Sequence, residues 1–455
     1  MPFRLIIFWT AAAFADAPAT SSPPDPGRPA LSLAQAEQLA LRQQPTIRQA
    51  QGQAEAAAGR VEEARSGYLP QVTATAAYQR TTGNFSARPG AVVQTSTGTV
   101  GGMAAGMIAA AGTTSTVVWT PTFNYWTLGV SASQLIYDFN STADRWRSAS
   151  AGYDAAVAST HASETQALLA VRRAYFQALA QRDLARVAAE ALENQQRHLE
   201  QIQAFVRAGI RSQIDLATAR TAVANARVQM VTADNAEASA RAILNQAMGV
   251  PETTTYQLTD GDEPPVPGED GASAELIQIA LRARPEIAAA EEQRRAQELT
   301  VSAFRGNYGP ALSATGGLTD TGTTHLTPNW FVGLSASWAI LQGGLTRGQI
   351  HEANGTLSAL AAQVDAVRLQ VGTDVEQARL AVRAAKATID GAEEALTNAR
   401  EQLRLAEGRY RTGLGSVIEL ADAQVAYTTA AAQEVSARYN VDAARAQLLA
   451  ALGTR

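Results

Sequence analysis

Apolar and polar positions follow a helical period along most of the chain, which predicts an unusually helical protein. Short helices are expected from Leu33 to Gln43 and from Pro45 to about Gly67. Helical hairpins are expected at about 140–248 and about 344–452, with no interior proline. Helices in globular proteins average about 11–12 residues, so hairpins this long need packing partners along their whole length.

The return helix of the first hairpin carries two stripes of small or apolar residues at heptad spacing. One stripe begins at Ile214 and includes Val228, and the other begins at Ala217 and includes Val231. A soluble hairpin coiled coil needs only one such stripe. Two adjacent stripes predict close neighbours on both sides of the helix.

Four stretches alternate with a period of two, which predicts strands at about 70–80, 126–138, 310–320 and 330–341. Tilted strands of about 10–12 residues are long enough to cross a bilayer. Aromatic residues toward the strand ends are typical of an interfacial girdle. These are Tyr78, Trp126, Trp330 and Trp338. On the strands alone, a water-soluble β-sandwich is the alternative.

The segment between the first two strands, about 80–123, has no sustained period and is rich in Gly, Thr, Ser and Ala. We expect a long loop there. Its glycine-rich part is not followed by Lys-Ser or Lys-Thr, and the chain's only lysine is Lys386. A phosphate-binding loop is therefore not expected.

The first residues predict export. Arg4 precedes a short apolar run that ends in the small-x-small sequence Ala13-Phe14-Ala15, so residues 1–15 are interpreted as a signal peptide. The alternative is a buried N-terminal helix. The following residues, 16–30, are rich in Pro and Ser and predict an extended leader.

A single clear linker, residues 251–273, combines Pro, Gly and acidic residues. Three of its acids, Asp260, Asp262 and Glu263, suggest a calcium loop as an alternative. Their spacing fits no EF-hand, so a solvated linker is favoured.

The linker separates two copies of one pattern, a first repeat over 31–250 and a second over 274–455. LALRQQP, ending at Pro45, returns as IALRARP, ending at Pro285 (285 − 45 = 240). Each hairpin turns at an Arg-x-Gly, with Gly209 in the first and Gly413 in the second (413 − 209 = 204). The chain is an internal duplication of helix, strand, strand, helix and helix.

Composition excludes several classes of function. The chain has 455 residues, no cysteine and a net charge of −5. It lacks the basic stripe that nucleic acid requires, and it cannot form disulfides, thiolate zinc sites or a lipid anchor through Cys. No catalytic triad or nucleophile motif is recognisable, so we expect no enzyme and no cofactor. Metal binding is not expected, because the four histidines have no ligand spacing. They are His161, His198, His325 and His351.

Four membrane strands cannot close a barrel, and open strand edges are not viable in lipid, so several chains must share one barrel. Two chains would give eight strands with a filled interior, whereas three would give twelve with a lumen. The same three chains would place their long helices side by side as a tube. The architecture predicts a conduit.

With these features, the chain resembles the TolC family of outer-membrane efflux and secretion channels. The resemblance rests on the LALRxxP openings, the Tyr-x-Pro strand entries, the strand–helix corners at Ile136-Tyr137-Asp138 and residues 340–344, and the two Arg-x-Gly tips. It implies a mainly α fold with membrane β. Three chains would form a homotrimer, with a 12-stranded β-barrel continued by an α-helical barrel. The linker at 251–273 would lie in an equatorial region.

The resemblance also implies location and partners. The protein would lie in the outer membrane of a Gram-negative bacterium, in contact with its lipid, and reach into the periplasm. Its tips would dock on a periplasmic adaptor coupled to an inner-membrane pump, in efflux or type I secretion. The implied docking residues are Arg207, Gly209, Ile210, Arg411, Gly413 and Leu414.

At the periplasmic entrance, the resemblance implies acid rings at Glu419 and Asp422, and a Tyr410 hydroxyl bonded to Asp215. The family's arginine falls on Gly415, so its charged link is missing here. From the residues alone, Asp215 and Glu419 lie in first turns of helices, where carboxylates also serve as caps.

Two other classes of function remain open. A periplasmic coiled-coil adaptor or scaffold also has helical hairpins, but an adaptor has a single hairpin flanked by lipoyl-like and β-barrel modules. A soluble coiled-coil scaffold or exported enzyme is the third class. The exported substrate is not indicated by the sequence.

Overall fold

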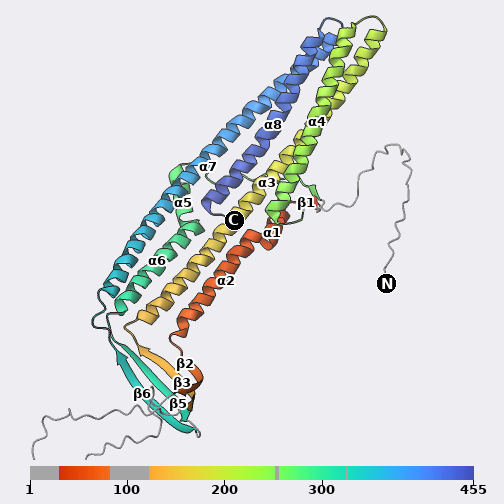
Figure 1. Ribbon diagram of the computed structural model, residues 1–455. Coiled ribbons are helices and arrows are strands. Elements are labelled where there is room, and N and C mark those ends of the chain that lie inside the picture. The colour runs from red at the N-terminus through yellow and green to blue at the C-terminus, as the bar shows by residue number, and fades with distance from the viewer. Residues whose placement is uncertain (1–29, 82–121, 252–255, 323–325, 455) are drawn as a thin grey trace, which may run out of the picture. The chain divides into compact units, whose positions relative to one another are not determined.

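The computed structural model describes residues 30–81, 122–251, 256–322 and 326–454 (Figure 1). The predicted signal peptide, nearly all of the leader and most of the loop at 80–123 lie outside the described residues, as does His325.

The two repeats produce helices of matching length. The 11-residue helices are α1 (Leu33–Gln43) and α5 (Ser273–Ala283), and the 22-residue helices are α2 (Pro45–Ser66) and α6 (Pro285–Gly306). The 67-residue helices are α3 (Ser141–Arg207) and α7 (Leu345–Arg411), and the 36-residue helices are α4 (Gln213–Met248) and α8 (Val417–Leu452). None of the helices in the described ranges combines the length and apolarity needed to cross a membrane.

The chain divides into two compact units. Unit 1 contains the described residues of 1–44, 170–264 and 389–443, and unit 2 contains those of 45–169, 265–388 and 444–455. Each unit therefore combines segments of both repeats, because α3, α7 and α8 contribute residues to both units.

Unit 2 contains one antiparallel sheet in the order β2–β3–β5–β6 (Figure 1). Its strands are β2 (Gln71–Thr81), β3 (Phe123–Tyr137), β5 (Ala311–Gly322) and β6 (Thr327–Ser337). Pairing of β3 with β5 joins the two repeats edge to edge. The repeats also share a hydroxyl contact at equivalent positions, Thr73 with Ser131 and Ser313 with Ser335, each at 2.9 Å.

The last strand is shorter than predicted, because it ends at Ser337 instead of continuing to about 341. The residues after it enter a corner in which the Ile340 N–H donates to the Trp338 carbonyl at 3.1 Å. Gly343 and Gly344 then take positive φ of 59° and 90°. Alternation in the sequence continues through this corner although strand pairing has stopped.

The equivalent corner of the first repeat places non-glycine residues in the same left-handed region. Phe139 and Asn140 have φ of 54° and 65°. A Cβ at Gly309 would lie 2.2 Å from the Phe139 ring, so Gly309 provides the space into which that ring packs. This packing offsets backbone strain that glycine avoids in the second repeat.

The helical part of unit 2 has its own apolar core. Four residues of α7 at helical spacing lie at its centre and contact α5, α6 and the end of α8. They are Val371, Val375, Ala378 and Val382. Arg284, at the junction of α5 and α6, donates to the Ala451 carbonyl and pairs with Asp374 at 2.9 Å. The short helices are thereby fixed against the long ones.

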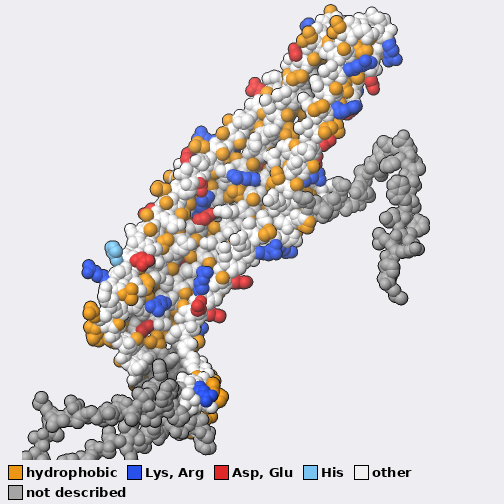
Figure 2. Space-filling view, in the orientation of Figure 1, with side chains coloured by type: hydrophobic (Ala, Val, Ile, Leu, Met, Phe, Trp, Pro, Cys, Tyr) orange, Lys and Arg blue, Asp and Glu red, His pale blue; other side chains and the backbone are white. Residues whose placement is uncertain are grey.

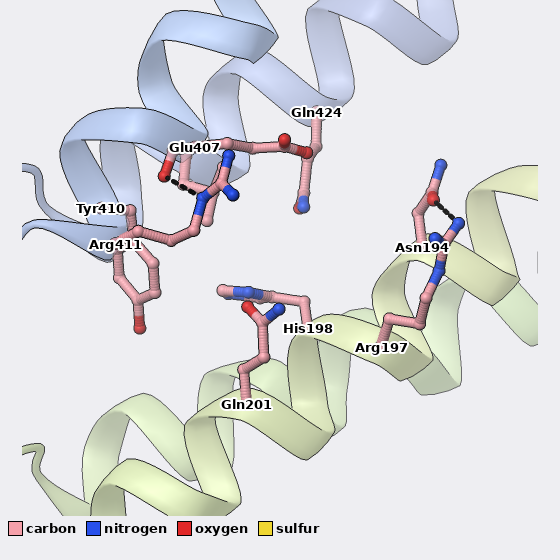
Figure 3. Close-up of a pocket in the computed structure, with 9 residues that line it drawn as sticks. Asn194, Arg197, His198, Gln201, Glu407, Tyr410, Arg411 and Gln424 are labelled. Carbon is pink, nitrogen blue, oxygen red and sulfur yellow. Dashed lines mark hydrogen bonds between the residues drawn. The ribbon is translucent and has the colours of Figure 1, made fainter.

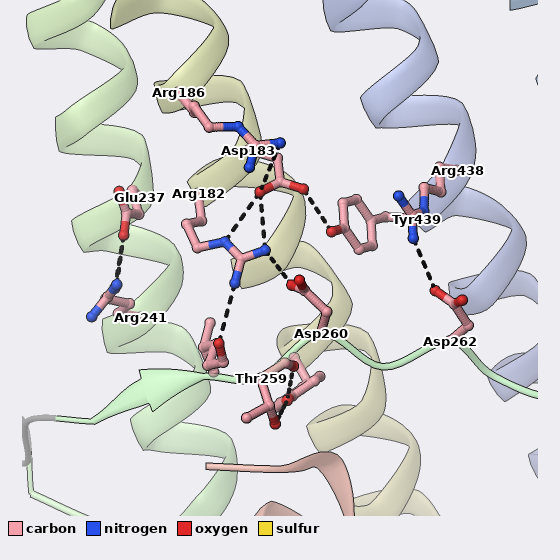
Figure 4. A network of polar contacts seen from close by, with 12 residues as sticks. Arg182, Asp183, Arg186, Glu237, Arg241, Thr259, Asp260, Asp262, Arg438 and Tyr439 are labelled. Carbon is pink, nitrogen blue, oxygen red and sulfur yellow. Dashed lines mark hydrogen bonds and ion pairs between the residues drawn. The ribbon is translucent and has the colours of Figure 1, made fainter. Parts of the chain in front are cut away.

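In unit 1 the linker is fixed to the helices by ion pairs and by a parallel bridge of β1 (Ala30–Leu31) with β4 (Gln257–Leu258). Arg182 contacts Asp260 at 2.5 Å, and Arg438 contacts Asp262 at 3.3 Å (Figure 4). The buried Tyr439 hydroxyl donates to Asp183 at 2.7 Å. These linker carboxylates, considered above as calcium ligands, pair with arginines.

Candidate functional site at the helical tips

The first tip is a tight turn between α3 and α4 in unit 1. Gly209 has φ of +73°, and the Ile210 N–H donates to the Phe205 carbonyl at 2.9 Å. Ser212 then caps α4, and Asp215 completes a reciprocal capping box with it. Glycine thus ends one helix, and a Ser-x-x-Asp sequence starts the next.

The second tip, between α7 and α8, has the same turn with a different capping arrangement. Gly413 has φ of +77°, and the Leu414 N–H donates to the Arg409 carbonyl at 3.0 Å. The Ser416 hydroxyl accepts the Glu419 N–H at 3.0 Å. The Glu419 carboxylate, however, pairs with Arg409 at 3.1 Å.

Both hairpins contribute to one apolar cluster in unit 1. Its buried members are Ile202, Ala219, Ala406, Tyr410, Leu420 and Ala423. Tyr410 is 3% exposed, with the Arg211 guanidinium carbon 4.8 Å from its ring centroid and the His198 ring edge-on at 5.3 Å. The two tips are therefore joined by packing on Tyr410.

The hydroxyl of Tyr410 has no hydrogen-bond partner within the described ranges. The Asp215 carboxylate, the acceptor implied by the resemblance, accepts the Ser212 N–H at 3.4 Å instead. Burial raises the pKa of Tyr410, and Asp215 raises it further, whereas Arg211 lowers it. Tyr410 is held by the contacts of its ring, and the Asp215 carboxylate serves the capping box.

The three acids predicted at the tips lie in three different environments. Asp215 is a helix cap, and Glu419 belongs to an ion pair. Asp422 is exposed, and the described residues offer it no side-chain partner.

Gly415 leaves little space for the arginine that the resemblance would place there. Its own N–H donates to the Arg409 carbonyl at 3.0 Å. A Cβ at this position would lie 3.0 Å from the Tyr410 nitrogen and 3.1 Å from the Arg409 Cβ, which is tighter than nine in ten real Cβ contacts. The equivalent position of the first tip is Arg211 (415 − 204 = 211), whose guanidinium lies over Tyr410.

A cavity of about 190 Å³ lies beside Tyr410 (Figure 3). It is lined by polar side chains of α3 and α7, including His198 and Glu407, and by Gln424 of α8. Burial lowers the pKa of His198, so the ring is neutral at pH 7. No cluster of three His, Cys, Asp or Glu suited to a metal ion occurs within the described ranges.

The predicted docking residues lie at the tips themselves, and all six are exposed. Ile210 is 67% exposed and Leu414 is 77% exposed. The others are Arg207, Gly209, Arg411 and Gly413. Each tip thus presents an apolar side chain directly after its turn glycine, with an arginine two residues before that glycine.

The four aromatic residues predicted as a girdle all belong to the sheet region of unit 2. Tyr78 and Trp126 are cross-strand partners with ring centroids 4.6 Å apart. Trp330 pairs with Leu318 and is 76% exposed. Trp338 follows the other end of β6, where its indole N–H donates to the Tyr308 carbonyl at 3.0 Å.

Sequence reasoning did not single out Arg211 and Arg409 at the tips. The duplication contains a signal for Arg211, because this residue aligns with Gly415, the position at which the resemblance would place an arginine. Arg409 aligns with the apolar Phe205 (409 − 204 = 205). His198, considered from the sequence only as a metal ligand, lies inside the hairpin contact beside Tyr410.

Comparisons with known proteins match this architecture. A family profile described as "Outer membrane efflux protein" matches residues 36–250 and 276–454. Protein CyaE of Bordetella pertussis is 27% identical over 334 residues, covering 72% of this chain and 70% of CyaE. Outer membrane protein TolC of Escherichia coli is 27% identical over 123 residues, covering 27% and 25%.

Among solved structures, the Campylobacter jejuni CmeC outer membrane channel superposes with a TM-score of 0.77 at 18% identity. The match covers 92% of this chain and 85% of that one. At this identity the likeness establishes the fold, with its long hairpins and its few strands.

Proposed function

This chain belongs to the outer membrane efflux protein family, and from that premise we propose that it is the passive exit duct of a tripartite efflux or type I secretion system. The resemblance inferred from the motifs is confirmed by this match and by the similarity to CyaE and TolC. In the proposed role the protein hydrolyses nothing, and its partner pump supplies the energy.

One observation supports the proposal most directly: long helical hairpins occur twice in the chain, and the return helix of the first leaves apolar residues exposed. On α4, Ile214 is 76% exposed, Val228 66% and Val231 63%. Isolated soluble chains rarely expose long apolar stripes, so these suit contact with further copies. We propose a homotrimer, since three chains give twelve strands and a lumen.

Surface charge is consistent with a duct that crosses an aqueous compartment. On the face drawn in Figure 2, acidic and basic side chains are interspersed along the helices. The proposed membrane contact is limited to the sheet, where Trp126, Trp330 and Trp338 would lie at lipid interfaces.

We propose that the entrance lies at the tips and that the trimer brings three copies of Glu419 and Asp422 together. Like charges in a constriction favour cations and raise one another's carboxyl pKa. Tyr410 would hold the hairpins closed through its buried ring. The exposed residues Ile210 and Leu414 would dock on a periplasmic adaptor, which connects the duct to its inner-membrane pump.

The purified protein tests this proposal in planar bilayers. We expect discrete conductance steps with cation preference, and a loss of that preference in Glu419→Ala combined with Asp422→Ala. A channel whose preference is unchanged in the double variant would place the selective constriction elsewhere.

Cell fractionation separates the duct from the other classes of function. We expect recovery with the outer membrane, whereas recovery in the soluble periplasm would contradict a duct. A periplasmic adaptor with a single hairpin is not favoured, because this chain has two hairpins of equal length. Pull-down of the partner pump would identify the exported substrate class.

A further inference from the structure

We propose that Arg409 determines the ion specificity of the tip by neutralising Glu419, which leaves Asp422 as the charge that selects cations. This inference rests on the proposed function, because it concerns ions that pass the tips of a trimeric duct. It alters the role of the predicted acid pair, since only one of the two carboxylates would act on a passing ion.

The first step is the ion pair itself. The Arg409 Nε lies 3.1 Å from a Glu419 carboxylate oxygen, and the pair joins the end of α7 to the first turn of α8. Both side chains remain partly in water, at 58% and 42% exposed. Opposite charges this close together present a dipole to a passing ion in place of a net negative charge.

The second step is the space that lets Arg409 reach across the turn. A Cβ at Gly415 would lie 3.1 Å from the Arg409 Cβ and 3.1 Å from its carbonyl carbon. A side chain at 415 would therefore displace Arg409 from its present position. The glycine and the Arg409–Glu419 pair are parts of one arrangement.

The third step is the contrast with Asp422, one turn further along α8. It is exposed, and it has no ion-pair or hydrogen-bond partner within the described ranges. Among these three groups, the formal charges are −1 for Asp422, −1 for Glu419 and +1 for Arg409. Their sum is −1, and Asp422 is the group outside the ion pair.

Reversal potentials of planar-bilayer channels under a KCl gradient test the inference. Arg409→Met keeps the aliphatic stem and removes the charge, so cation preference should rise, about twofold or more at low salt. The rise should shrink in about 1 M salt, where the Debye length is about 3 Å. Arg409→Met combined with Glu419→Gln should return the preference to that of the wild type.

Arg400→Met is the matched control, because it removes the same charge from an exposed position of the same helix, about two and a half turns before Arg409. It should leave the preference nearly unchanged, and Arg409→Lys should retain the wild-type value. Equal shifts in Arg409→Met and Arg400→Met, or no shift in Arg409→Met, would overturn the inference.

The same recordings separate this inference from the proposed function. A wild-type protein that forms no channel would contradict the duct. A normal wild-type channel in which Arg409→Met changes nothing would contradict only the role of Arg409. The pairing is also contradicted if the Arg409→Met and Glu419→Gln double variant keeps the raised preference of the single variant.

Discussion

The two tips of the chain have the same backbone turn and different chemistry. Gly209 and Gly413 end their helices in the same left-handed conformation. At the first tip the acid is a cap and the arginine lies over a ring of the other hairpin. At the second tip the acid pairs with Arg409, and position 415 holds glycine. Duplication preserved the turn, while the side chains diverged to serve two roles.

This difference indicates a division of labour. Tip 1 contributes contacts that hold the hairpins together, because Arg211 contacts Tyr410 and Asp215 stabilises α4. Tip 2 contributes the charges proposed to face ions. The backbone turn does not determine these roles. A Schellman-type turn requires only the glycine, so the flanking side chains can differ between the tips.

Removing Tyr410 should have the largest effect, because its ring joins the two tips. Tyr410→Ala deletes a ring that is 3% exposed, and loss of such an aromatic residue costs about 3–5 kcal/mol. Hydrogen exchange of the tip amides should show easier opening in both hairpins. Val206→Ala, at the equivalent position of the first repeat, is the matched control and should cost less, because Val206 is only partly buried.

Tyr410→Phe tests how the ring is held. Its hydroxyl lacks a partner in the structure, so we expect amide exchange and single-channel conductance close to the wild type. Exchange as fast as in Tyr410→Ala would show that the hydroxyl forms a bond after all, and Asp215 would be the first acceptor to test.

Adding a side chain at Gly415 should affect tip 2 next most strongly. Gly415→Ala places a Cβ 3.0–3.1 Å from the backbone of Arg409 and Tyr410, and overpacking of this kind costs about 1–3 kcal/mol. Amide hydrogen exchange of residues 409–416 measures the loss of local stability. Gly408→Ala is the control, because nothing lies within 4 Å of a Cβ there. Equal effects of the two would contradict the close approach.

Removing Arg211 should have a smaller effect. A cation over an aromatic ring is worth about 0.5–2 kcal/mol, depending on burial, so Arg211→Ala should modestly speed exchange at both tips. Arg207→Ala removes a nearby exposed arginine that donates to the Gln203 carbonyl of its own helix. It should have no such effect, and an equal change in both variants would indicate a general charge effect.

The smallest expected effect is a change in the stability of the closed tips with pH, through protonation of His198. Burial lowers the pKa of His198 below its ordinary value, so the unfolded or opened tip binds a proton more readily than the closed one. The resulting stability is present above about pH 6.5 and is lost as pH falls through the lowered pKa. His198→Asn should flatten this dependence in amide exchange between pH 7 and pH 5, and an unchanged slope would assign it to other groups.

Much of the fold could be predicted from sequence, because long periodic segments and turn glycines act locally. The helix at Leu33–Gln43 and the fold class are confirmed. The predicted end of the last strand was wrong, since alternation continues through the corner at Trp338–Leu341 after pairing stops. The left-handed Phe139 and Asn140 had no local signal, and only their alignment with Gly343 and Gly344 marks them.

The candidate site was less predictable, because its contacts depend on which groups compete for each partner. Asp215 has two possible uses, and the Ser212 cap takes it by proximity along the helix. Arg409 reaches Glu419 because the turn brings residues ten apart (419 − 409 = 10) onto adjacent helices. Neither outcome follows from the residue types alone.

The most direct test of the division between the tips compares two single substitutions that remove one carboxylate each. Reversal potentials of Asp422→Asn and Asp215→Asn channels should differ: the first should lose most of its cation preference, and the second should keep it. Equal loss in both variants, or an unchanged potential in Asp422→Asn, would contradict the account.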